Sequence, residues 1–240
     1  MTLLHNTRLE LRMRSRLDLR IAGKGSEAKL DLRIAGKGSE AKLDLRITGR
    51  KMRCKKEEFV RDAVFHIYNH SVAEIDLFYD RHDYFYFLQK LTDNFSSDEI
   101  AVYAYCLMPN HFHFCIKQKS DRPIYDIFNR FLISYTLHFN AKYKRKGKVF
   151  ANKLQHKKIN NDKYLLDICP YIHRNPVKAG LVNLPCEWEF SNYHEWLGSR
   201  NSKLFDNEVL VNYFEDPMNY KKYVENFDEI EIKEYLYSKT

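Results

Sequence analysis

The sequence predicts an α+β fold in which an antiparallel sheet carries packed helices. Short segments rich in β-branched and aromatic residues, or with polar–apolar alternation, favour strands at 63–70, 99–108 and 111–118. Apolar residues at helical spacing favour helices at 80–95, 123–145 and 161–174. The resulting order β-α-β-β-α-β-α is typical of a sheet with helices on one or both faces.

The first half of this pattern has three predicted strands and one helix. Ala63–His70 mixes β-branched and aromatic side chains, which favours a strand. Asp80–Phe95 is predicted to be a helix because its apolar residues recur at helical spacing. These residues are Tyr84, Phe87, Leu88 and Leu91. Glu99–Met108 and His111–Gln118 are the next two strands, joined by a Pro-Asn turn.

The second half is dominated by helices. Pro123–Arg145 is predicted to be a long helix with an apolar face, formed by Ile127, Phe128, Phe131, Tyr135 and Phe139. Lys148–Ile159 is expected to form one or two short basic strands. Asn161–Arg174 is a further predicted helix, capped by Asn161 or Asp162. Residues 205–240 are expected to form one or two short amphipathic helices in an acidic tail.

Three regions are predicted along the chain. Leu17–Lys29 reads LDLRIAGKGSEAK, and Leu30–Lys42 repeats it without a change. A period of 13 residues matches no common solenoid, so residues 1–51 are interpreted as a disordered basic leader, with a DNA-tethering arm as the alternative. Residues 52–198 form the predicted globular domain, and residues 199–240 the acidic helical tail.

Composition narrows the class of protein. The net charge is +8, and residues 201–240 hold nine acids against five bases, so the positive excess lies in residues 1–200. Such a balance favours a polyanionic partner. The five cysteines include no C-x-x-C pair, which argues against a disulfide framework and for a reducing compartment, the cytoplasm. No apolar run approaches the ~18 residues of a membrane span.

A histidine pair stands at the start of the third predicted strand. Side chains at i and i+2 of a strand share a face, so His111 and His113 would lie together while Phe112 points into the core. Two adjacent imidazoles suit two ligands of one metal ion. The alternative is two half-exposed histidines on a sheet, because the pattern H-x-H is weak by itself.

A tyrosine near a helix end offers a nucleophile. The hydroxyl of Tyr171 could attack phosphorus, and Asn175, four residues later on the same helix face, could add a neutral oxygen ligand. A divalent cation would withdraw charge from the phosphate. With 17 tyrosines in the chain, residue type alone does not select this one, and Tyr135 is the next candidate.

A basic segment without acids lies between the histidine pair and the tyrosine. Aromatic residues are interleaved with its cations, and this composition suits binding to phosphates and unpaired bases. The sequence is equally consistent with a solvated helix end followed by a hairpin. The cations are Lys142, Lys144, Arg145, Lys146, Lys148, Lys153, Lys157 and Lys158.

At these residues the chain resembles a known family. Tyr105–Phe114 (YCLMPNHFHF) is similar to the histidine–hydrophobic–histidine motif of HUH single-strand DNA transposases with one catalytic tyrosine. Tyr171–Gly180 (YIHRNPVKAG) resembles the tyrosine segment of the REP-associated tyrosine transposase branch. Val64–Asn69 and Trp188–Tyr193 resemble that branch's first strand and its tryptophan–serine segment. The resemblance covers residues 58 to 198.

The resemblance implies an HUH endonuclease fold, with a sheet of RRM-like or ferredoxin-like topology. It implies that His111, His113 and Asn175 bind Mg²⁺ or Mn²⁺ and that Tyr171 is the nucleophile. The implied reaction is cleavage and rejoining of single-stranded DNA through a 5′-phosphotyrosine, at hairpin-containing sites, by a monomer or homodimer. Two departures concern the helix: Pro170 is expected to kink it, and Pro176 to loosen the relation between Tyr171 and Asn175.

Two other readings stay open. One is a non-catalytic regulator, derived from such a transposase, that binds DNA or RNA. The other is a structural zinc site formed by His111, His113 and Cys115, which would share one strand face.

Overall fold

The structure is a computed structural model that describes residues 29–35, 42–48, 59–228, 232 and 236. The chain divides into two compact units, Met1–Cys54 and Lys55–Thr240, and each is treated by itself.

In the first unit, β1 (Lys29–Ala35) and β2 (Lys42–Thr48) form an antiparallel pair. The sequence predicts a disordered leader at these positions, and the rest of that leader lies outside the described residues. The two strands are the same stretch of the repeat, in which polar and apolar residues alternate with the two-residue period of a strand. This local alternation accounts for the strands.

The second unit is built on a four-stranded antiparallel sheet. It contains β3 (Val64–His70), β4 (Ile100–Met108), β5 (His111–Gln118) and β6 (Gln155–Ile159). The strand order is β4-β5-β3-β6, with every neighbour antiparallel. The predicted α+β fold class is therefore confirmed. In the predicted basic strand region 148–159, only β6 is a full strand.

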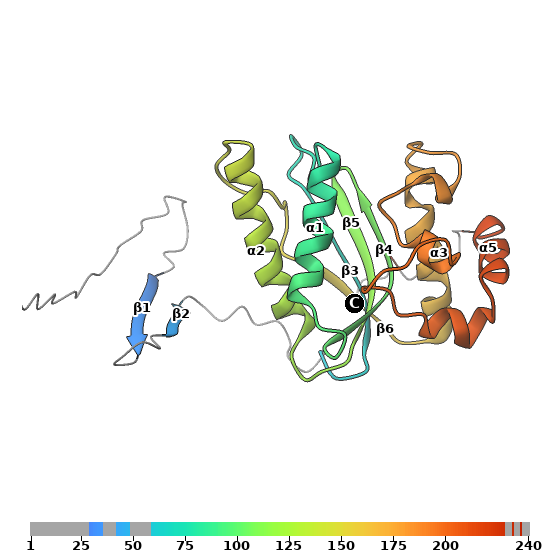
Figure 1. Cartoon of the computed structure of the whole chain (residues 1–240), viewed down its shortest axis with the longest axis horizontal. Coiled ribbons are helices and arrows are strands. Elements are labelled where there is room, and N and C mark those ends of the chain that lie inside the picture. The colour runs from blue at the N-terminus through green and yellow to red at the C-terminus, as the bar shows by residue number, and fades with distance from the viewer. Residues whose placement is uncertain (1–28, 36–41, 49–58, 229–231, 233–235, 237–240) are drawn as a thin grey trace, which may run out of the picture. The chain divides into compact units, whose positions relative to one another are not determined.

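Helices α1 (Arg81–Asn94) and α2 (Ile124–Lys142) cover one face of the sheet (Figure 1). Asp80 caps α1 by accepting a hydrogen bond from the backbone of Asp83. Phe112 and Phe114 of β5 project to this side, where their rings lie 5.5 Å from Phe87 and 5.6 Å from Phe128. The apolar face predicted for α2 is buried as expected.

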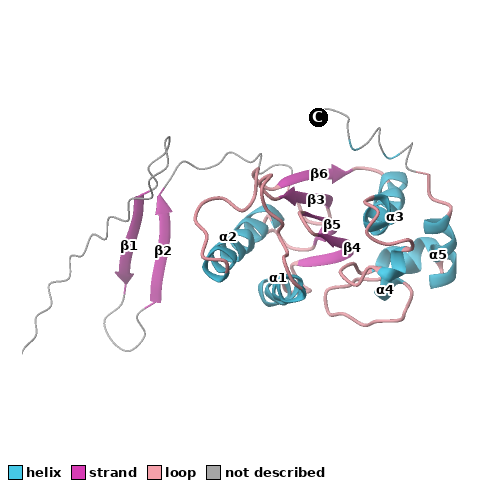
Figure 2. Ribbon diagram, turned by 90° about the horizontal axis from the view of Figure 1, so that it is seen from above, coloured by secondary structure: helices cyan, strands magenta, loops and turns pink. Residues whose placement is uncertain are grey.

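Helix α3 (Asp162–Lys178) covers the opposite face (Figure 2). Asn161 caps it, since Oδ1 of Asn161 accepts a hydrogen bond from the backbone of Tyr164 at 2.7 Å. The helix ends four residues later than predicted, beyond both Pro170 and Pro176.

The chain after α3 forms a second core against α3 and β4. Its elements are η2 (Pro185–Glu187), α4 (Tyr193–Trp196), the π-helical turn η3 (Leu210–Phe214) and α5 (Pro217–Glu225). The ring of Trp196 lies 3.9 Å from Tyr220, and its indole donates to the backbone oxygen of Tyr103 at 2.8 Å. The described part of the predicted acidic helical tail, residues 199–240, thus packs on the domain.

Within the described residues, no helix is both long and apolar enough to cross a membrane.

Candidate active site

His111 and His113 lie side by side on β5, a central strand of the sheet. Their ring centroids are 5.1 Å apart, with an interplanar angle of 84°. Strand alternation puts both on the face that carries α3, whereas Phe112 between them is fully buried on the other side. As predicted, the two histidines share one face of the sheet and Phe112 points into the core on the other.

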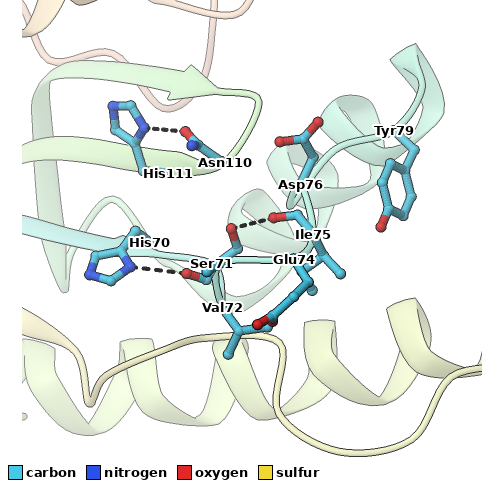
Figure 3. A pocket seen from close by; sticks show the side chains of 10 residues that line it. His70, Ser71, Val72, Glu74, Ile75, Asp76, Tyr79, Asn110 and His111 are labelled. Atoms are coloured by element: carbon cyan, nitrogen blue, oxygen red, sulfur yellow. Dashed lines mark hydrogen bonds between the residues drawn. The ribbon is translucent and has the colours of Figure 1, made fainter.

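Asn110 determines which nitrogen of His111 carries a proton. Nδ1 of His111 lies 2.7 Å from Oδ1 of Asn110 (Figure 3), and an amide oxygen can only accept a hydrogen bond. Burial, with the nearby charge of His70, lowers the pKa of His111 to about 4, so this imidazole is neutral at pH 7. Its one proton is therefore on Nδ1, and its lone pair is on Nε2.

His113 is contacted from the neighbouring strand β3. Nε2 of His66 lies 3.0 Å from Nδ1 of His113, and the two rings are stacked at an interplanar angle of 19°. Burial lowers the pKa of His66 to about 3 and that of His113 well below its ordinary range. Both rings are neutral at pH 7, and His66 occupies Nδ1 of His113 rather than Nε2.

Tyr171 reaches these histidines from α3. Its ring centroid lies 6.0 Å from that of His113 and 6.4 Å from that of His66, edge-on in both cases. Lys178 is about two turns further along the same helix, and its Nζ lies 5.4 Å from the centroid of the Tyr171 ring. A phenol, two neutral imidazoles and an ammonium group therefore gather between α3 and the sheet.

α3 continues without interruption through Pro170 and Pro176, so Tyr171 lies within the helix. Pro176 has no N–H for the backbone oxygen of Ile172. Nδ2 of Asn175 approaches that oxygen at 3.4 Å and donates to the backbone oxygen of Tyr171 at 2.8 Å. The amide nitrogen of Asn175 thus has a structural role, and Oδ1 is the atom of this side chain that could bind a cation.

His111 and His113, on one face of β5, could offer two neutral nitrogens to a divalent cation. In the described part of the chain, no three His, Cys, Asp or Glu side chains are grouped to hold a metal ion. Water or substrate oxygens would have to complete the coordination.

The zinc reading is not supported by Cys115. This residue is fully buried, and its thiol interacts with that of Cys169. Burial and this hydrogen bond raise the pKa of the Cys115 thiol well above its ordinary value, which disfavours the thiolate that zinc requires.

An open pocket of about 510 Å³ adjoins His111. Figure 3 shows that the segment 70–76 forms one wall, with Tyr79 and Asn110 beside it. The carboxylates of Glu74 and Asp76 line it, so this pocket beside His111 contains hydrogen-bond acceptors. The volume is within the range of small-molecule pockets.

The predicted basic segment does not form one surface. Lys142 makes ion pairs with Asp83 at 2.7 Å and with Asp80 at 3.0 Å, so it ties α2 to the start of α1. On β6, Lys157 pairs in register with His66 and Lys158 with Phe65, so these two lysines project from opposite faces. The remaining cations, Lys144, Arg145, Lys146, Lys148 and Lys153, lie in the connection between α2 and β6.

Two residues of the site, His66 and Lys178, were not predicted from the sequence. The signal for His66 is its alternation with Tyr68 on β3, but its partner depends on the register with β5. The signal for Lys178 is its spacing of seven residues from Tyr171, which returns to the same helix face.

Comparisons with known proteins converge on one kind of protein. The family model described as "Transposase IS200 like" matches residues 60–175. A protein of Haemophilus influenzae that carries the name REP-associated tyrosine transposase is 29% identical over 102 residues. That match covers 38% of this chain and 57% of the relative, so the chain matches little more than half of the relative's length.

A solved structure shares the fold. Its TM-score is 0.50 at 14% identity, and the match covers 63% of this chain and 92% of the other. It is described as a REP-associated tyrosine transposase bound to a REP hairpin. This likeness agrees with the antiparallel sheet and packed helices described above.

Proposed function

We propose that this chain is a transposase of the IS200-like family, whose model matches residues 60–175, and that it cuts and rejoins single-stranded DNA with Tyr171 as the nucleophile. The observation that carries the proposal is the contact between Tyr171 on α3 and His113 on β5, at a centroid distance of 6.0 Å. It brings a phenol next to one of the two imidazoles that could hold a cation.

In the proposed reaction, Oη of Tyr171 attacks a backbone phosphorus, and the bond from phosphorus to the 3′ oxygen breaks. The phenol loses a proton and the departing 3′ oxygen gains one, so the products are a 5′-phosphotyrosine and a free 3′-OH. Rejoining is the reverse attack by a 3′-OH. Nζ of Lys178, beside the phenol, supplies positive charge near the phosphate.

His111 and His113 would hold a divalent cation, Mg²⁺ or Mn²⁺, through Nε2, and Asn175 would contribute Oδ1. When bound, the cation withdraws charge from the scissile phosphate. The neutral state of both imidazoles supports this role, because only an unprotonated nitrogen can coordinate.

The proposed substrate is a DNA hairpin with a single-stranded flank. The solved structure that shares this fold is described as bound to a REP hairpin, and the positive excess of residues 1–200 suits a polyanion. Lys157, on the same sheet face as His66, would contact the backbone of the flank.

Covalent trapping tests the proposal. A pool of hairpins with randomised single-stranded flanks, labelled at the 3′ end, is incubated with the full chain and Mn²⁺ and then denatured. We expect a labelled adduct for the wild type and none for Tyr171→Phe. Tyr68→Phe is the matched control, because the Tyr68 ring also lies close to His113, at 5.9 Å.

The outcomes of this trapping assay distinguish the proposed transposase from the non-catalytic regulator. An adduct that survives Tyr171→Phe and disappears in Tyr68→Phe would move the nucleophile to β3. Tight hairpin binding by the wild type without any adduct would favour the non-catalytic regulator.

A further inference from the structure

His66 is a buried polar residue that the proposed chemistry does not use. It is 1% exposed, and its Nε2 lies 3.0 Å from Nδ1 of His113. The register between β3 and β5 brings the two rings to the same face, where they stack at a centroid distance of 5.2 Å. Within the described residues, Nδ1 of His66 has no hydrogen-bond partner. The contact with His113 is thus the one hydrogen bond recorded for this side chain in that part of the chain.

The direction of this hydrogen bond decides what His113 can do. If His66 donates, the single proton of neutral His113 is on Nε2, and that nitrogen cannot coordinate a cation. If His113 donates from Nδ1, its lone pair is on Nε2 and is available. Only the second arrangement is compatible with a cation on His113.

His111, the other proposed ligand, already has its proton on Nδ1 and its lone pair on Nε2. Nδ1 of His111 donates to Oδ1 of Asn110, which leaves Nε2 for a cation. Metal-binding histidines generally donate their second ring N–H to an outer partner, which fixes the tautomer and the orientation of the ring. His66 stands in the position of that partner for His113.

We propose that His66 is a positioning residue that accepts the Nδ1 proton of His113, so that Nε2 of His113 faces the cation. This inference rests on the proposed function, since it assumes that His113 is a ligand. In the bound state the proton of His66 is on its own Nδ1.

Binding of Mn²⁺ alone to the full chain, followed by electron paramagnetic resonance of the free ion, tests this role without turnover. His66→Phe retains an aromatic ring in the stack but cannot accept a hydrogen bond. His66→Gln places an amide oxygen near the position of Nε2. We expect His66→Phe to weaken Mn²⁺ binding by about tenfold, the lower end of the effect of removing such a partner, and His66→Gln to recover most of the loss.

His113→Ala separates this inference from the proposed function. If His113→Ala binds Mn²⁺ as the wild type does, or the wild type binds none, His113 is not a ligand and both ideas fail. If His113→Ala weakens binding while His66→Phe does not, only the role of His66 is overturned. Equal losses in His66→Phe and His66→Gln would mark His66 as a packing residue and overturn the inference. The unfolding midpoint of each variant shows whether the fold is retained.

Discussion

The ring of Tyr171 lies edge-on to that of His113, with centroids 6.0 Å apart and planes at 79°. One residue belongs to a helix and the other to the strand beneath it, so the contact depends on how α3 packs on the sheet. This packing brings the proposed nucleophile next to a proposed ligand of the cation.

Removal of the cation should stop cleavage but leave hairpin binding largely intact. We expect a chelator, or either His111→Ala or His113→Ala, to reduce the covalent adduct to background, because the charge on the phosphate is then no longer withdrawn. The labelled adduct is measured beside hairpin affinity in a filter-binding assay.

His138→Ala is the histidine control for these variants. His138 is on α2, across the sheet, where its ring stacks on Tyr86 at 3.6 Å. Loss of the adduct in His138→Ala, or its persistence in both ligand variants, would contradict the assignment.

Two adjacent lysines test which face of the sheet binds DNA. Lys157 pairs with His66 on the face of the histidines, whereas Lys158 pairs with Phe65 on the other face. We expect Lys157→Gln to weaken binding of the single-stranded flank and to lower the slope of log affinity against log salt by about 1, the value for one phosphate contact. Lys158→Gln should leave both quantities nearly unchanged. The reverse order would place the DNA on the other face.

Lys142 should matter for stability rather than for DNA. Its ammonium lies 2.7 Å from a carboxylate of Asp83, whose side chain is 2% exposed. Lys142→Met would leave this buried charge without its cation, and we expect the free energy of unfolding to fall by roughly 3 kcal/mol. Lys144→Met, in the following connection, should change it little. Denaturant unfolding measures both, and equal stability of the two variants would refute the structural role.

The helices could be predicted from the sequence because their signals are local. The apolar residues of α2 recur at helical spacing, and all five predicted members of its face are buried. Similarly, Asn161 before α3 is a capping residue by type, and it caps the helix. Local signals do not give the strand order, since β3 lies between β5 and β6 through long-range pairing, and only the resemblance to HUH transposases implied the sheet topology.

In the candidate site, too, local relations could be predicted from the sequence and long-range contacts could not. The relation between His111 and His113 follows from strand alternation alone. His66 joins them only through the register of β3 on β5, and a shift of one residue would send it to the opposite face. The pattern of charges likewise could not show that Lys142 is held by Asp83, because that carboxylate is on another helix.

Tyr135, the other candidate nucleophile, is poorly placed. It is 1% exposed on the α2 side of the sheet, and its hydroxyl donates to the backbone oxygen of Leu77 at 2.5 Å. Burial raises the pKa of this phenol well above its ordinary value. A phosphate would have to enter the core to reach it.

Mass spectrometry of the protein–DNA adduct is the most direct measurement of the central claim. After proteolysis and nuclease digestion, the account predicts a nucleotide phosphate on the peptide that contains Tyr171. The same phosphate on a peptide that contains Tyr135, Tyr68 or any other residue would contradict it.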